Sequence, residues 1–192
     1  WVLIDVRKTM EQIILMLKRQ FESEGIEIIL KLGRQPLYVN GNSTQLQQVF
    51  YNLASNAKDA VRDSSKKEIQ FRIKRRKAEA IFEIEDSGEG IAPKDLHNIF
   101  APFFTTKPLG KGTGLGLSVS NNIIKKHNGS LECINKGSGN STLFRVSLPL
   151  IKTEFAGIIF ISLQNRLWSS WLDQAHCPVL LQSNHTFPTQ LL

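Results

Sequence analysis

The sequence predicts an α/β fold, because stretches with helical spacing alternate with strand-like stretches over its first 150 residues. Two clusters of glycine also flank one long irregular segment that fits neither pattern. The predicted helices are residues 6–23, 43–63 and 115–127, and the predicted strands are residues 26–30, 36–39, 69–73, 81–85, 131–134 and 142–148.

The first predicted helix is amphipathic and ends at Gly25. Its apolar face carries Ile13, Ile14, Leu17 and Phe21. A mostly apolar strand and a second short extended segment follow it.

The second predicted helix begins after Asn42, which forms an N-cap pattern with Gln45 three positions later. At about 100° per residue, its apolar side chains cover one arc of roughly 120°. The members of this arc are Leu46, Val49, Phe50, Leu53, Ala57, Ala60 and Val61.

Asn52, Asn56 and Asp59 form a polar stripe along one edge of this arc. Asn is a mediocre helix former, so two of them one turn apart at the border of a buried face need a reason. Either they satisfy hydrogen bonds on the solvent side, or their amide oxygens face a polar pocket. In a pocket, an amide oxygen is a suitable ligand for Mg²⁺ alongside phosphates and waters.

The two strands at residues 69–73 and 81–85 predict a hairpin with one buried face, which leads to a lone carboxylate at Asp86. In the third helix we expect Leu115, Val119, Ile123 and Ile124 to point inward. Gly129 has the position of the C′ residue that closes this helix.

Glycines crowd both ends of the irregular segment. Glycine lets the backbone approach a ligand closely, and just before a helix it exposes amides that favour an anion. The pattern therefore predicts a phosphate site. The glycines are Gly88, Gly90, Gly110, Gly112, Gly114 and Gly116.

The segment between the glycine clusters exceeds the roughly 12–15 residues beyond which a loop in a compact domain is usually a lid, a binding loop or a linker. Three aromatic side chains, Phe100, Phe103 and Phe104, argue against a disordered linker. We interpret this segment as a lid over a ligand.

Composition sets further bounds: 192 residues and 41% hydrophobic content suffice for one domain with an appendage. The chain has no initiator Met, so we expect a piece of a longer protein. No signal peptide is recognisable, and the apolar run 155–163 is about half the roughly 20 residues of a membrane span. Cys133 and Cys177 lack metal-site or disulfide spacing, which leaves a reducing cytosol as the expected compartment.

The net charge of +7 lies before residue 151. We interpret the basic stretch KKEIQFRIKRRK as a solvated strand face, because stacking aromatics are not interleaved with its charges as in a nucleic-acid site. Residues 151–192 carry little charge and show neither helical nor strand periodicity. Three interpretations of them stay open: a docking appendage, a disordered tail and a non-native extension.

Four motifs in order resemble the catalytic ATP-binding domain of sensor histidine kinases, in the superfamily of DNA gyrase, the 90-kDa heat-shock chaperone and MutL (the GHKL superfamily). These are NLASNAKDA (52–60) as the N box, DSGEGI (86–91) and GKGTGLGL (110–117) as glycine boxes, and FAPFFTTK (100–107) as the F box. The likeness covers roughly residues 5–150, within a predicted ATP-binding domain of residues 1–150, and is closest to the nitrogen-regulation (NtrB-like) branch. It implies a two-layer α/β sandwich (the Bergerat fold) with a mixed sheet of about five strands, three helices on one face and a long ATP lid.

The resemblance also implies the ligands and their residues. Asn56 would bind Mg²⁺ with Asn52 beside it, Asp86 would accept a hydrogen bond from the adenine amino group, and Lys107 would neutralise phosphate charge. Asn52, Asn56 and Lys107 are the implied catalytic residues. Further implied ATP contacts are Ala60, Gly88, Gly90, Ile91, Thr106, Lys111, Gly112, Thr113, Gly114, Leu115, Gly116, Leu117 and Thr142, where Thr142 follows Ser141 in place of the usual Gly.

Hydrolysing relatives in this superfamily carry a Glu as base where this chain has Asn52, which cannot take a proton. The resemblance therefore implies phosphoryl transfer to a His on a separate dimerisation domain, with a response regulator further downstream. The four His residues here do not fit the acceptor role, and we expect them to be structural or exposed. We also expect a cytoplasmic domain without membrane insertion, in a parent that can be membrane-anchored.

Two alternatives to a kinase core follow. The first is a catalytically degenerate nucleotide-binding interaction module of the same superfamily. The second is a basic nucleic-acid binder, which the solvated-face interpretation disfavours.

Overall fold

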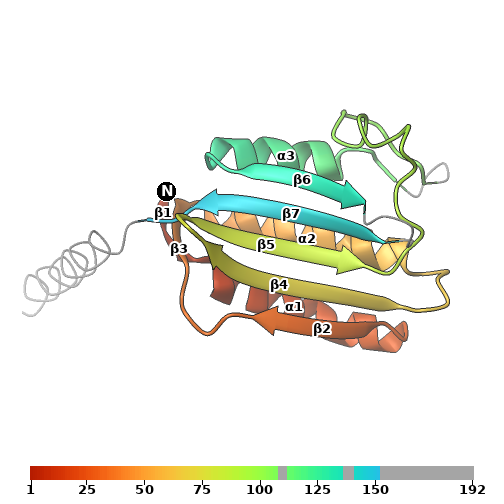
Figure 1. Cartoon of the computed structure of the whole chain (residues 1–192), viewed down its shortest axis with the longest axis horizontal. Helices are drawn as coiled ribbons and strands as arrows, with labels where there is room; N and C mark the ends of the chain where they lie inside the picture. Colours follow the sequence, from red (N-terminus) through yellow and green to blue (C-terminus); the bar gives the residue numbers. More distant parts are fainter. Residues whose placement is uncertain (108–111, 136–140, 152–192) are drawn as a thin grey trace, which may run out of the picture. The chain divides into compact units, whose positions relative to one another are not determined.

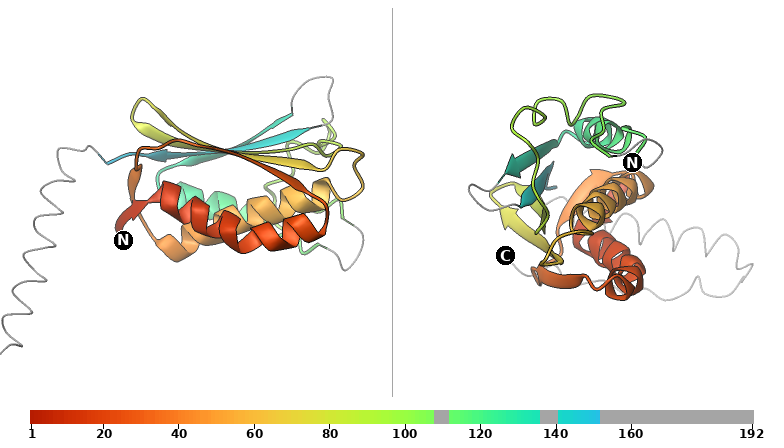
Figure 2. Two further views of the ribbon diagram at one scale, coloured as in Figure 1. Left: turned by 90° about the horizontal axis from the view of Figure 1, so that it is seen from below. Right: turned by 90° about the vertical axis from the view of Figure 1, so that its right-hand side faces the viewer.

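The computed structural model describes residues 1–107, 112–135 and 141–151. Within these residues, seven strands and three helices form two layers, with the helices on one face of the main sheet (Figures 1 and 2). The two-layer sandwich predicted from the sequence is therefore confirmed. The unassigned residues 152–192 lie outside the described part, as does Lys111.

The main sheet is mixed and has the strand order β2-β4-β5-β7-β6. β2 pairs parallel with β4, and the other neighbours are antiparallel. The five strands are β2 (Glu27–Leu32), β4 (Glu68–Arg76), β5 (Glu79–Asp86), β6 (Ser130–Asn135) and β7 (Thr142–Pro149).

A second sheet of two antiparallel strands, β1 (Val2–Asp5) and β3 (Tyr38–Gly41), was predicted only in part. The sequence indicated an extended segment near β3 but no partner for it. β1 is short and runs directly into α1 (Val6–Ser23), so it has no turn that would mark it as a strand.

The core lies between the helices and the sheet. Phe50 of α2 (Ser43–Ala60) stacks at 4.7 Å between ring centroids on Phe82 of β5. The inward residues of β4 alternate as expected, with Ile69, Phe71 and Ile73 buried. This packing fixes α2, and with it the N box, against the centre of the sheet.

Several predicted details of the helices are wrong. α2 ends at Ala60 rather than near residue 63, and Ala60 is exposed instead of completing the buried arc. Leu115 precedes α3 (Gly116–Lys126) and is 37% exposed rather than inward. These errors have one cause. The spacing of apolar residues predicts which face of a helix is buried, but it does not predict the residue at which the helix ends or loses contact with the core.

The C-terminus of α3 differs from the prediction by one residue. Asn128, with φ 55°, takes the left-handed C′ position, and the Gly129 N–H donates to the Ile124 carbonyl at 3.0 Å. Gly129 is needed for space, since a Cβ there would lie 2.9 Å from a methyl carbon of Leu148.

His127 links the N-terminus of α2 to the C-terminus of α3. Its ring is buried, its Nδ1 lies 2.8 Å from the Ile123 carbonyl, and its Nε2 accepts the backbone N–H of Asn42 at 3.0 Å. Asn42 caps α2 through Gln45 as predicted, but its own N–H bonds to His127 rather than to the Gln45 side chain. The structural role expected for this His is confirmed.

Candidate nucleotide site

The site is built around Asp86, the last residue of β5. Its side chain is 2% exposed, and Oδ1 accepts the Gly88 N–H at 2.9 Å. Burial raises the pKa of the Asp86 carboxyl from 3.8 to about 6, although hydrogen bonds from the backbone of Gly88 and Thr142 oppose the rise. A buried carboxylate with only backbone donors retains acceptor capacity for a ligand.

Gly88 connects Asp86 to the end of α2. A Cβ at Gly88 would lie 2.6 Å from the Ala60 carbonyl oxygen and 2.8 Å from Asp86 Oδ1. Only glycine fits there without a shift of the chain. Ala60 thus borders the site through its backbone.

Thr142 lies beside Asp86 in the sheet, and Cys133 lies on β6, one strand further from Asp86. Thr142 stands directly opposite Asp86 in the pairing of β5 with β7 and is buried. Burial and the charge of Asp86 raise the pKa of the Cys133 thiol to about 12, so it stays protonated at neutral pH. The thiol therefore adds no charge to this end of the site.

A second group of polar residues lies on α2 and the lid. Lys107 Nζ is 2.6 Å from Asp59 Oδ2 and donates to Asn56 Oδ1 at 3.3 Å. Asn56 and Lys107, both predicted site residues, are therefore in contact. Since Asn56 precedes Ala60 by about one helical turn of roughly 5.4 Å, the two groups form neighbouring parts of one site.

Asp59 belongs to the predicted polar stripe but was not assigned to the site. Its carboxylate also pairs with Arg62 at 2.5 Å. The signal that could have found it is its spacing of one turn from Asn56.

Asn52 holds α2 against the start of α3. Its Nδ2 donates to the Gly116 carbonyl at 3.4 Å and to Ser120 Oγ at 3.3 Å. The amide nitrogen is thus engaged between helices.

The second glycine box packs on the F box. Gly114, with φ 66°, lies so close to the backbone of Phe103 that a Cβ would overlap it. A Cβ on Gly112 would lie 2.6 Å from Thr105 Oγ1, and the hydroxyl of Thr105 accepts the Lys107 N–H at 3.2 Å. Thr105, rather than the predicted Thr106, makes the hydrogen bond that shapes this turn, although both side chains are exposed.

The remaining residues of the box lead into α3. The Thr113 hydroxyl accepts the Leu115 N–H at 3.3 Å, and Leu117 packs against the core. α3 begins without a side-chain cap, whereas Asp5 and Asn42 cap the other two helices. Its first amides therefore remain available to an anion.

The described part of the lid, residues 92–107, consists largely of successive turns. Ile99 is buried, and Phe100 and Phe104 pack against the core, whereas Phe103 is 75% exposed. Two of the three Phe residues thus hold this segment against the core.

The first glycine box is held at its far end by a residue that the sequence did not indicate. Gly90 has φ 78°, and the next residue, Ile91, exchanges hydrogen bonds through its backbone with the Asn135 side chain. Ile91 itself packs against the core.

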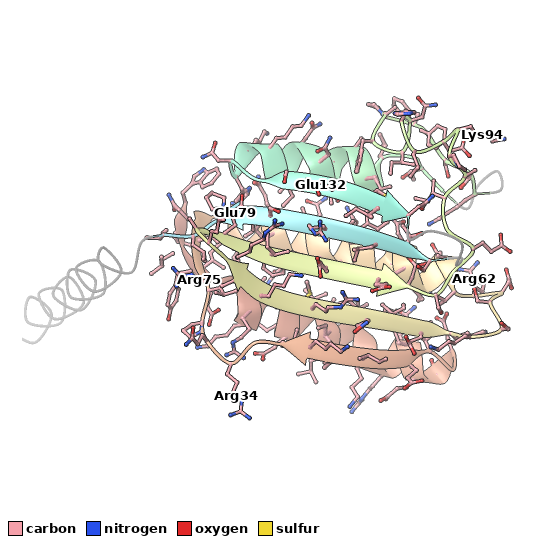
Figure 3. All side chains as sticks on the ribbon, in the orientation of Figure 1. Arg34, Arg62, Arg75, Glu79, Lys94 and Glu132 are labelled. Carbon is pink, nitrogen blue, oxygen red and sulfur yellow. The ribbon has the colours of Figure 1, made fainter. Side chains whose placement is uncertain are left out.

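The outer face of the sheet, opposite the helices, carries charged side chains (Figure 3), and several of them form ion pairs. Lys74 and Arg145 bind Glu83 at 3.1 Å and 2.8 Å, and Arg72 pairs with Glu83 and Glu85. Burial alone would raise the pKa of Glu83, but Lys74 and Arg145 outweigh this effect and lower the pKa. Two basic residues of the KKEIQFRIKRRK stretch, Arg72 and Lys74, are thus neutralised on a strand face.

Fold and site together define an ATP-binding α/β sandwich of the histidine kinase type. The chain belongs to the family described as histidine kinase-, DNA gyrase B- and HSP90-like ATPases, whose model matches residues 41–152. The resemblance seen in the four motifs is thereby confirmed, while the finer likeness to the nitrogen-regulation branch stays a prediction.

Relatives agree with this placement. The two-component sensor PprA of Pseudomonas aeruginosa is 39% identical over 74% of this chain, and sporulation kinase A of Bacillus subtilis is 35% identical over 76%. The chain spans only 16% and 23% of these two proteins. The catalytic domain of histidine kinase ThkA matches with a TM-score of 0.68 and 25% identity, covering 77% of this chain and 94% of that domain.

Among the residues that the structure describes, no helix combines the length and apolar character that a membrane span requires.

Proposed function

We propose that this chain is the catalytic half of a sensor histidine kinase, which transfers the γ-phosphate of ATP to a His on a separate dimerisation domain. The observation that carries the proposal is the placement along α2 of two complementary groups. Asp86 and Gly88 offer a buried acceptor for adenine at the end of α2, and Asn56 and Lys107 offer an oxygen ligand and a cation one turn away.

Mg²⁺ fits the chemistry of this second group. Within the described residues no cluster of three or more His, Cys, Asp or Glu could hold a metal. Mg²⁺ usually keeps several waters and takes few protein ligands besides substrate phosphates, so the Asn56 amide oxygen suffices. When bound, the ion would neutralise phosphate charge, while Lys107, and Lys111 by its motif position, would do the same from the lid.

Asn52 favours transfer over hydrolysis. It takes the position of the water-activating Glu of hydrolysing relatives, its amide cannot accept a proton, and its nitrogen is engaged with α3. A nucleotide-binding module without catalysis is not favoured, because the matched relatives include proteins named as kinases.

The proposal that the phosphoacceptor lies on a separate domain is supported by the surroundings of His127. His127 is buried with both ring nitrogens in hydrogen bonds, so it cannot attack a phosphate. We therefore propose a His-bearing dimerisation domain and a response regulator as partners in the parent protein, and a cytoplasmic location for this domain.

Calorimetric titration of the full chain tests the nucleotide site. ATP and ADP should bind with Mg²⁺ dependence, and GTP should not bind, because its ring offers Asp86 a carbonyl instead of an amino group. Equal binding of GTP would overturn the adenine assignment.

Phosphotransfer is tested by adding a His-bearing helical hairpin from a related kinase in trans with γ-labelled ATP. We expect acid-labile label on the hairpin, and none with Asn56→Ala. An unlabelled hairpin despite ATP binding, with several matched hairpins, would contradict the kinase proposal.

A further inference from the structure

We propose that Asn135, at the end of β6, is a positioning residue for the adenine part of the site, an inference that rests on the proposed function. It acts through the backbone of Ile91. Asn135 lies outside all four sequence motifs.

The side chain of Asn135 pairs with both polar groups of one backbone residue. Its Oδ1 accepts the Ile91 N–H at 3.3 Å, and its Nδ2 donates to the Ile91 carbonyl. A primary amide carries a donor and an acceptor side by side, so it can replace the backbone of a neighbouring strand. The far end of the first glycine box, at Ile91, is therefore attached to β6 through the Asn135 side chain.

The position of Asn135 relates this attachment to Asp86. Asn135 stands opposite Thr142 in the pairing of β6 with β7, and Thr142 stands opposite Asp86 in the pairing of β7 with β5. Directly opposed residues of antiparallel strands point to the same face. Asp86, Thr142 and Asn135 thus form a row across three strands on the face that the helices cover.

The glycine box spans this row. Gly88 N–H binds Asp86 at one end, and Ile91 is held by Asn135 at the other. Between them, a Cβ on Gly90 would come within 3.9 Å of Asn135 Oδ1 and 3.7 Å of the Ser141 backbone nitrogen. Asn135 therefore sets the path of the chain that borders Asp86, without itself being required to touch the nucleotide.

Calorimetry of ADP and ATP binding to the full chain tests the proposal with two variants. Asn135→Ala removes the side chain, and Asn135→Leu keeps its branched shape without either hydrogen bond. We expect both variants to bind ADP and ATP about tenfold more weakly, because each of the two lost hydrogen bonds contributes only a modest net free energy. The loss should be the same for ADP and ATP, whereas Lys107→Ala should lose more for ATP.

Glu132→Ala is the matched control, because Glu132 lies on the same strand, half-exposed, and pairs loosely with Arg145 at 3.8 Å. It should bind ADP as the unchanged protein does. Hydrogen exchange adds a local readout: the Ile91 amide should exchange faster in both Asn135 variants, while the Phe144 amide in β7 stays protected.

The outcomes separate the two proposals. An unchanged protein that fails to bind ADP overturns the proposed function. ADP binding that Asn135→Ala and Asn135→Leu leave unchanged overturns the positioning role alone. Faster exchange throughout the sheet in these variants also overturns it, since Asn135 would then serve the fold generally.

Discussion

At the residue scale, Asp86 couples stability to nucleotide binding. Its pKa in the folded protein, about 6, lies above the ordinary 3.8, so the folded chain holds the proton more tightly than the unfolded chain. Ionisation therefore destabilises the fold. The cost is absent below pH 4, grows between pH 4 and 6, and is complete above pH 6, at roughly 3 kcal/mol.

We predict that Asp86→Asn raises the free energy of unfolding at pH 7.5 by about 1–3 kcal/mol while it abolishes ADP binding. The gain in stability stays below the roughly 3 kcal/mol cost of ionisation. The amide that replaces the Asp86 carboxylate has one acceptor oxygen instead of two, so it satisfies the backbone donors of Gly88 and Thr142 less well than the carboxylate does. Urea unfolding at pH 7.5 and pH 4 measures it, and the difference from the unchanged protein should shrink at pH 4. Wild-type-like ADP affinity in the variant would refute the role of Asp86.

The affinity for ADP should also depend on pH. The ionised carboxylate is the better acceptor for the adenine amino group. The affinity for ADP should therefore be highest above pH 6 and should fall several-fold as the pH drops below about 6. Titrations between pH 5 and 8 check this. A flat profile would mean that Asp86 does not meet the base.

Gly88 is expected to tolerate no side chain. Gly88→Ala would push a methyl group against the Ala60 carbonyl, so we predict a loss of about 1–3 kcal/mol in stability and at least tenfold in ADP affinity. Gly33→Ala is the control, because its Cβ would make an ordinary 3.5 Å contact with Ile73. Equal behaviour of both variants would contradict the steric argument.

The Asp59–Lys107 pair should affect binding more than stability. Both side chains are partly exposed, at 22% and 34%, so breaking the pair should change the free energy of unfolding by less than about 1 kcal/mol. Asp59→Asn should tighten ATP binding several-fold, since it frees Lys107 and removes a negative charge near the phosphates. Calorimetry without Mg²⁺ isolates this effect, and weaker binding would show that Asp59 assists the phosphates instead.

At the element scale, the site depends on how α2 and α3 are held together. Asn52 joins α2 to the start of α3 beside the second glycine box. His127, at the end of α3, binds Asn42 at the start of α2. The site residues of α2 and the first amides of α3 can therefore keep a fixed spacing.

We predict that His127→Ala lowers the free energy of unfolding by about 1–3 kcal/mol, because it leaves a cavity and deprives the Asn42 N–H of its acceptor. ADP affinity should fall much less than in Asp86→Asn. His97→Ala, in the exposed lid, should stay within about 0.5 kcal/mol. Thermal and urea unfolding compare the three proteins, and an unaffected His127→Ala would contradict the linking role.

At the scale of the whole molecule, residues 1–151 form one compact unit. Ile151 belongs to it, because its N–H donates to the Tyr38 carbonyl at 2.9 Å. We predict that truncation after Ile151 keeps the fold and the ADP affinity of the full chain, since all four motifs precede that residue. Parallel thermal unfolding and calorimetry of the two chains decide this, and lost affinity would make the tail part of the domain.

Local patterns in the sequence determined the α/β class, the three helices, the five strands of the main sheet and the four motifs. Helical and strand periodicity, an N-cap at Asn42 and crowded glycines are properties of neighbouring residues, so they are visible before folding. Asn56 and Asp86 stood out in these local patterns, whereas Lys107 was named only through the resemblance of its motif to the F box of the family.

Only the tertiary structure decided which of these residues meet. Lys107 reaches Asp59 and Asn56 across 48 and 51 positions, Asn135 reaches Ile91 across 44, and His127 reaches Asn42 across 85. Such contacts depend on how α2, the lid and the strands pack, and no periodicity within one element encodes them. The same holds for the raised pKa of Asp86, because burial arises only when β5 enters the assembled core.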